Sequence, residues 1–209
     1  MFSDLSVFQL VVLLVSIILS LSIHEATHGY VAHWLGDDTA HAMGRLTLNP
    51  LKHIDIVTTV ALPMFLIIAG LPPFFVAKPV PFNPERVRWG EYGAALVGVS
   101  GPLTNLLLAG VGALAFHAFG LTASPDIYNA ILIFVQVNIA FFIFNMIPFP
   151  PLDGSRLLYA FAPEPLQRVM LQIEQTGFLA ILVFFFFIFQ FISGPIINIE
   201  NSLLQFLLG

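Results

Sequence analysis

The feature that most constrains the fold of this chain is a set of long apolar segments that contain almost no charged side chains. Residues 7–23 read VFQLVVLLVSIILSLSI, and residues 91–119, 128–147 and 177–193 are similarly apolar. A bilayer core about 30 Å thick is crossed by roughly 20 apolar residues of helix. The sequence therefore predicts an all-α polytopic membrane protein that occupies a lipid bilayer, with residues 1–209 forming one domain.

The first span extends beyond its uncharged part. The segment continues without proline through HEATHGYVAHWLG, and Gly36 suits a helix end, so we expect one helix over about residues 7–35. Only 9% of the residues are charged and the net charge is −5, which excludes a nucleic-acid-binding surface. The chain has no cysteine, which excludes disulfides and thiolate metal sites.

Residues 56–76 form a further apolar segment, interrupted by Pro63 and by the Pro72-Pro73 pair. If this segment does not cross the membrane, all seven Lys and Arg residues fall on one side, whereas a crossing divides them between both sides. Basic residues gather on the cytoplasmic side of membrane proteins. We therefore expect four transmembrane helices, an N-terminus outside and a re-entrant or shallow segment at 56–76. A fifth span at 56–76 is the alternative.

The first span carries an HExxH motif, in which His24 and His28 share one helix face and can bind a single metal ion. Glu25 lies close enough to activate a water at that ion, and zinc suits imidazole ligands.

Polar side chains recur every four residues along the same face, at Ser16, Ser20, His24 and His28. Interhelical packing is the alternative role, but ionisable side chains inside a membrane helix are costly without partners. The helix end near Leu35 is about 15 Å beyond Glu25, which places the site inside the membrane, nearer the basic side.

A catalytic zinc usually has three protein ligands, so a third residue is needed. Asp153 has the most suggestive context, because three prolines over residues 148–151 end the third span just before it. Irregular backbone at membrane depth is tolerated only where it lines a cavity or is buried in protein. A helix cap is the alternative role for Asp153.

His33 points away from the face of the motif, and His117 lies at the far end of its helix. Spacing leaves open the candidates His41, His53 and Asp55.

Asparagines in the second and third spans are further candidates for the site. Asn105 and Asn145 can donate hydrogen bonds to a substrate or to a developing oxyanion, although interhelical hydrogen bonding is the alternative for both and the expected role of Asn138. Residues 44–50, GRLTLNP, alternate like a strand that can pair with an extended peptide, with an ordinary loop strand as the alternative.

These motifs, in this order, resemble the site-2 protease family of intramembrane zinc metalloproteases. They are HExxH on a transmembrane helix, Gly-Pro-x-x-Asn at 101–105 and Leu-Asp-Gly at 152–154. Residues 44–55 and 77–84 resemble the compact prokaryotic branch of that family, and the resemblance covers about residues 16–160. It implies one Zn²⁺ per chain, bound by His24, His28 and Asp153, with Glu25 as the catalytic glutamate.

The resemblance implies an endopeptidase that cleaves transmembrane segments of membrane proteins, in regulated intramembrane proteolysis, with the active site nearer the cytoplasmic side of a prokaryotic cytoplasmic membrane. Its expected partners are a transmembrane substrate and the bilayer, without nucleic acid. The sequence does not address oligomeric state. One alternative is a membrane metal transporter, which needs polar residues along several spans. Another is an inactive binding homologue, which would have a broken motif.

Overall fold

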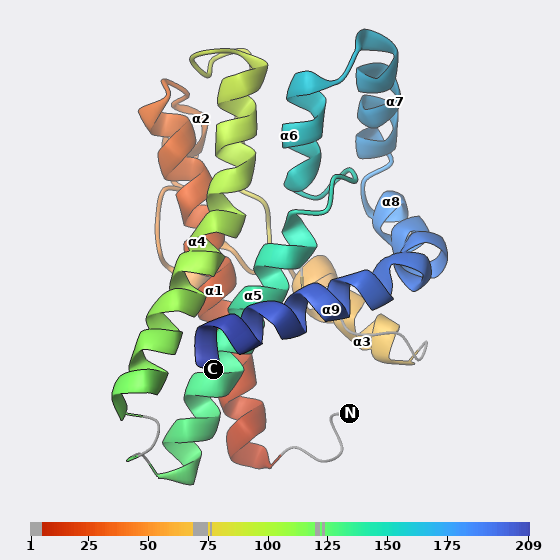
Figure 1. Ribbon diagram of the computed structural model, residues 1–209. Coiled ribbons are helices and arrows are strands. Elements are labelled where there is room, and N and C mark those ends of the chain that lie inside the picture. Colours follow the sequence, from red (N-terminus) through yellow and green to blue (C-terminus); the bar gives the residue numbers. More distant parts are fainter. Residues whose placement is uncertain (1–5, 69–74, 76, 120–121, 123) are drawn as a thin grey trace.

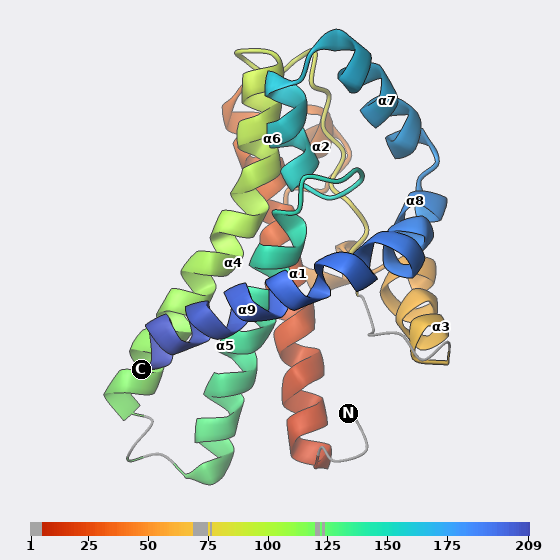
Figure 2. The same ribbon diagram turned by 45° about the vertical axis from the view of Figure 1, so that its right-hand side comes forward.

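A computed structural model gives the arrangement of the chain. The residues that it describes are 6–68, 75, 77–119, 122 and 124–209. Three long helices, α1 (Val7–Trp34), α4 (Glu91–Phe119) and α5 (Pro125–Asn145), pack side by side (Figures 1 and 2). With the apolar stretch Leu179–Leu208, the described part of the chain holds four helices that are long and apolar enough to cross a membrane. The prediction of an all-α polytopic membrane protein is confirmed.

Short helices connect the long ones. They are α2 (Thr39–Ala42), a 3-10 turn (Pro50–Lys52), a π-helical turn (Ile56–Ala61), α3 (Leu62–Ile68), α6 (Gly154–Phe161), α7 (Glu164–Gln175) and α8 (Phe178–Val183). α2, α6 and α7 lie at one end of the bundle, and the start of α1, the end of α4 and the start of α5 lie at the other (Figure 1). The described residues contain no strand, so residues 44–49 form an irregular connection rather than the predicted strand.

The ends of α1 follow from its sequence. Ser6 and Gln9 form a capping box, in which the Gln9 N–H donates to Ser6 Oγ at 3.2 Å and the Ser6 N–H donates to Gln9 Oε1 at 2.9 Å. Gly36 follows the helix with φ 108°, a left-handed conformation that glycine adopts without a Cβ clash. The polar stripe that includes His24 and His28 is buried, so α1 turns this face towards the other helices.

The described part of the ambiguous segment consists of the π-helical turn and α3, of six and seven residues. These are too few to cross a bilayer. Leu62 and Leu66 of α3 are buried against Phe184 and Phe185, which follow α8, and α3 lies away from the axis of the bundle (Figure 1). Residues 69–74 and 76, to which the prediction of a re-entrant segment also applies, lie outside the described residues.

The last apolar segment remains helical beyond residue 193, where we expected its end. α8 passes through a π-helical turn (Phe184–Ile188) into α9 (Phe189–Leu208), which runs obliquely across α4 and α5 (Figures 1 and 2). Pro195 lies inside α9 without ending it, because apolar side chains of α9 such as Leu203 pack on the α4–α5 contact. Proline is tolerated in membrane helices where neighbouring helices pack closely.

Candidate metal centre

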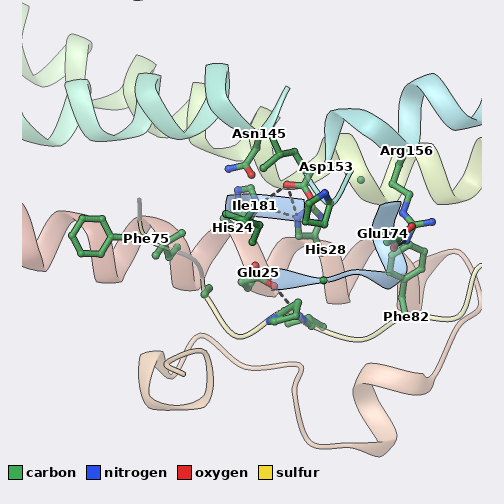
Figure 3. Close-up of a pocket in the computed structure, with 18 residues that line it drawn as sticks. His24, Glu25, His28, Phe75, Phe82, Asn145, Asp153, Arg156, Glu174 and Ile181 are labelled. Carbon is green, nitrogen blue, oxygen red and sulfur yellow. Dashed lines mark hydrogen bonds and ion pairs between the residues drawn. The ribbon is translucent and has the colours of Figure 1, made fainter. Parts of the chain in front are cut away.

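The two histidines of the HExxH motif meet inside the bundle. Both are buried on α1, and their Nε2 atoms lie 3.0 Å apart, with the rings edge to face. The spacing of four residues places them one helical turn apart on the same face. Figure 3 shows this pair in the middle of a cavity, with Glu25 beside it on the same helix.

Asp153 completes the cluster from the break between α5 and α6. Its Oδ2 atom lies 3.0 Å from His24 Nε2 and 3.3 Å from His28 Nε2. Asp153 occupies the position before the first residue of α6, but its side chain makes no capping hydrogen bond. The capping role that the sequence left open for this carboxylate is therefore not observed, and its side chain faces the two imidazoles.

The outer nitrogens of both imidazoles are held by oxygen atoms of other helices. His24 Nδ1 lies 2.6 Å from Asn105 Oδ1, and His28 Nδ1 lies 2.7 Å from the Val97 carbonyl oxygen. A carbonyl oxygen can only accept, so each Nδ1 carries the proton and donates it. In a neutral imidazole, the Nε2 atom then presents a lone pair to the centre of the cluster.

Asn105 lies behind the histidine pair rather than in the cavity. Its Oδ1 accepts from His24, its Nδ2 donates to Asn138 Oδ1 at 3.0 Å, and the residue is fully buried. Asn105 is not among the residues that line the cavity, and its hydrogen bonds join α4 to α1 and α5, as in the interhelical role that the sequence offered as an alternative. Asn145 does line the cavity, and its Nδ2 donates to the Phe141 carbonyl at 3.0 Å.

The cluster has the chemistry and the dimensions of a zinc site. With both imidazoles neutral, the cluster brings together three acceptor atoms at 3.0–3.3 Å from one another, which repel unless a cation lies among them. A tetrahedral zinc ion holds its nitrogen and oxygen ligands roughly 3.3 Å apart. Gly101 of α4 leaves the space, because a Cβ atom there would come within 2.6 Å of His24 Nε2 and still closer to His28 Nε2. Within the described part of the chain, no other group of three such side chains converges.

Glu25 points into the same cavity from α1. Its Oε2 atom accepts a hydrogen bond from the Val80 N–H at 2.8 Å. Val80 belongs to residues 77–84, which form an extended segment along this side of the cavity. The cavity has a volume of about 380 Å³, and its remaining walls come from the α5–α6 break, α6 and the α7–α8 connection (Figure 3).

The other candidate ligands lie elsewhere. His33 pairs with Asp38 at 2.7 Å, and its ring stacks on that of His41. His53 donates from Nε2 to the Thr47 carbonyl, and His117 donates to the Leu207 carbonyl. Asp55 accepts from the Val57 N–H at the start of the π-helical turn.

Sequence reasoning missed three contributions to the site. The Val97 carbonyl and the Val80 N–H are backbone groups, which every residue or nearly every residue supplies, so no side-chain pattern could have identified them. Gly101 carries a weak signal, because its place in the Gly-Pro-x-x-Asn motif is compatible with ordinary helix packing. The structure adds that a side chain there would meet the imidazoles.

The fold and the cluster together define a multi-pass helical membrane protein with a candidate metal centre inside its helix bundle. The chain belongs to the site-2 protease family. It is 37% identical over 180 residues to the protein named "Putative zinc metalloprotease YwhC" from Bacillus subtilis, covering 83% of this chain and 79% of that protein.

A second relative is more distant. "Putative zinc metalloprotease Rip2" from Mycolicibacterium smegmatis is 27% identical over 207 residues, covering 90% of this chain and 78% of that protein. The chain matches no family model and, at a significant level, no solved structure.

Proposed function

We propose that this protein is a zinc-dependent endopeptidase that cleaves transmembrane segments of other proteins within the bilayer. The observation that carries the proposal is the convergence of His24, His28 and Asp153 beside Glu25, in one cavity of a membrane-helix bundle. Both relatives bear the name of a zinc metalloprotease, which supports zinc as the metal and peptide hydrolysis as the reaction.

In this proposal His24 Nε2, His28 Nε2 and Asp153 Oδ2 hold one zinc ion. The bound ion supplies a Lewis acid that polarises a peptide carbonyl and makes water more acidic. Asn105 and the Val97 carbonyl keep both imidazoles in the tautomer that can bind the metal. Partners of this kind orient metal ligands and strengthen metal binding.

Glu25 serves as the general base. It takes a proton from the attacking water as the new C–O bond forms, and returns it to the amide nitrogen as the C–N bond breaks. The Val80 N–H, 2.8 Å from Oε2, holds the carboxylate towards the cavity. Asn145 lies on the cavity wall and is placed to donate to the developing oxyanion or to the substrate backbone.

The cavity suits an unwound apolar peptide. Apolar side chains such as Leu21, Val80 and Ile181 line it together with the polar cluster. A helical substrate has its amides hydrogen-bonded and must unwind before a carbonyl can be attacked. We place the site nearer the cytoplasmic face of a prokaryotic membrane, with cleavage of membrane-bound regulators as the biological role.

Counting zinc in purified protein tests the ligand set. We expect about one zinc per chain in the wild type, in Glu25→Gln and in the control His33→Ala, whose ring pairs with Asp38 outside the cluster. Asp153→Ala should lose most of its zinc, because it removes one of three ligands. Absence of zinc from folded wild-type protein after metal supplementation would refute the proposal.

Proteolysis is tested separately from metal binding. Wild type and Glu25→Gln are each co-expressed with a panel of tagged single-span membrane proteins, and the products are examined for fragments. A fragment cut inside the span by the wild type, and absent with zinc-loaded Glu25→Gln, is the expected result. Zinc-loaded wild type that cuts nothing in reconstituted membranes would favour a metal-binding role instead.

A further inference from the structure

Three side chains from three separate segments meet at one end of the cavity. Arg156 of α6 forms an ion pair with Glu174 of α7, and the Arg156 guanidinium lies 5.7 Å from the centre of the Phe82 ring. All three residues line the cavity, with the histidine cluster in the middle and Phe75 at the opposite end (Figure 3). The Arg156 and Glu174 side chains are 22% and 36% exposed, so this end of the cavity is partly open to the outside.

The wall that carries Phe82 is tied to α1 and to the turn that follows it. The Val80 N–H donates to Glu25, and the Asn83 N–H donates to the buried carboxylate of Asp37 at 2.6 Å. Further along, the Arg88 N–H donates to the Leu35 carbonyl at 2.9 Å. These bonds fix the extended segment at successive points, so this wall cannot easily move away from the cluster.

The wall formed by α7 is held much more weakly. Met170 is the only buried residue of this helix, and Gln167 Nε2 donates to the Tyr159 carbonyl at 3.0 Å. α7 is followed by Gly177, which has φ 55° and lines the cavity. A helix with few buried apolar contacts opens at low free-energy cost, so α7 can swing away while the core stays packed.

We propose that Arg156 and Glu174 form a latch across the mouth of the cavity, and that they must part for an extended peptide to reach the cluster. Arg156 joins the weakly held α7 on one side to the fixed Phe82 on the other. The assignment of a peptide as the incoming molecule rests on the proposed function. The opening itself does not, and it can be measured without metal or substrate.

The absence of native cysteine allows a direct measurement of opening. Ala77 lines the cavity and is 3% exposed, so Ala77→Cys adds a single buried thiol at a small side chain. Its rate of alkylation by N-ethylmaleimide in detergent reports the fraction of open molecules. We expect labelling about two- to fivefold faster with Glu174→Gln, which breaks the ion pair. Arg156→Gln also removes the ring contact and should give about five- to thirtyfold.

Matched controls separate opening from loss of structure. Glu164→Gln breaks the exposed Glu164–Arg168 pair on the same helix and should leave labelling of the Ala77→Cys thiol unchanged. A thiol at Ala109, buried between α4 and α5, should stay unreactive in every variant. The double exchange Arg156→Glu with Glu174→Arg restores an ion pair and should bring the rate back towards that of the parent.

The latch is refuted if folded Glu174→Gln and Arg156→Gln label at the parent rate, or if Glu164→Gln accelerates labelling equally. Neither latch residue belongs to the histidine–aspartate cluster, so both variants should keep the wild-type zinc content. A protein that binds no zinc would refute the proposed function, yet the thiol measurement would still decide whether the latch exists.

Discussion

At the scale of single residues, two ionisable imidazoles are tolerated inside a membrane helix because every ring nitrogen has a polar partner. The outer nitrogens donate to Asn105 and to the Val97 carbonyl, and the inner nitrogens face Asp153. Asn105 is itself anchored by Asn138, so a chain of hydrogen bonds from three helices orients the His24 imidazole. Unpartnered, these side chains would carry a heavy cost in the bilayer.

Gly101→Ala is the sharpest test of the packing around the cluster. The added Cβ would come within 2.6 Å of His24 Nε2 and still closer to His28 Nε2, so both rings must shift from the positions in which they face Asp153. We expect about 10- to 100-fold weaker zinc affinity, measured by competition with a chelator. Gly110→Ala, on the same helix with open space at its Cβ position, should bind zinc like the wild type. Equal affinities in the two variants would contradict this packing.

At the scale of elements, the site depends on a connection that has little regular structure. Asp37, just after α1, accepts hydrogen bonds from the Thr39 N–H and hydroxyl and from the Asn83 N–H. It is fully buried. Burial alone would raise the pKa of this carboxyl, but these bonds and the charge of Arg86 outweigh it and hold the pKa below its ordinary value. This carboxylate ties the Phe82-bearing segment to the end of α1.

Asp37→Asn should destabilise the protein by about 1–3 kcal/mol, because the amide can replace only part of the acceptor capacity and leaves a buried N–H without its partner. Thermal unfolding in detergent at pH 7 measures the loss. Asp38→Asn, at the neighbouring exposed position, should change stability by less than about 1 kcal/mol. A similar loss in both variants would contradict the role of Asp37.

The same carboxylate predicts a pH dependence with a definite sign. Its pKa is lowered on folding, so its stabilisation is complete above the unfolded value near 4 and disappears as the pH falls through the folded value. The stability difference between wild type and Asp37→Asn should therefore be constant from pH 8 to pH 6 and shrink below about pH 4. A difference that grows on acidification would reverse the sign and exclude this account.

At the scale of the whole molecule, the two ends of the bundle differ in chemistry. Arg156 and Arg168 lie on α6 and α7, at the end that also holds α2, whereas the last turn of α4 and the first turn of α5, at the other end, contain no Lys or Arg (Figure 1). Basic residues favour the cytoplasmic side. The half of α1 that carries the HExxH motif lies towards the end with α6 and α7. If that end is cytoplasmic, the candidate metal centre is accessible from the cytoplasm.

Single cysteines test this orientation in intact cells. Asp126→Cys, in the first turn of α5, should react with a membrane-impermeant maleimide from outside. Glu164→Cys, in the first turn of α7, should react only after the cells are permeabilised. The opposite pattern would invert the predicted topology, and labelling of both from outside would place the two ends on the same side.

Much of the element pattern could be predicted from local sequence. The apolar segments predicted four membrane-length helices, and the described residues contain four. The continuation of α9 through Pro195 to Leu208 could not be predicted, because the Gly194-Pro195 pair is a local signal for a helix end. Packing of α9 on α4 and α5 outweighs that signal, and it depends on residues far away in the sequence.

The sequence by itself determined the membrane class and the pairing of His24 with His28, since length, apolarity and a spacing of four act within one helix. Only the tertiary structure decided that Asp153 faces that pair across 129 positions of the chain, and that Asn105 supports His24 instead of facing the cavity. Helix periodicity sets which residues share a face. Which faces then meet depends on the packing of all the helices together, so the contacts between helices cannot be predicted from a local sequence pattern.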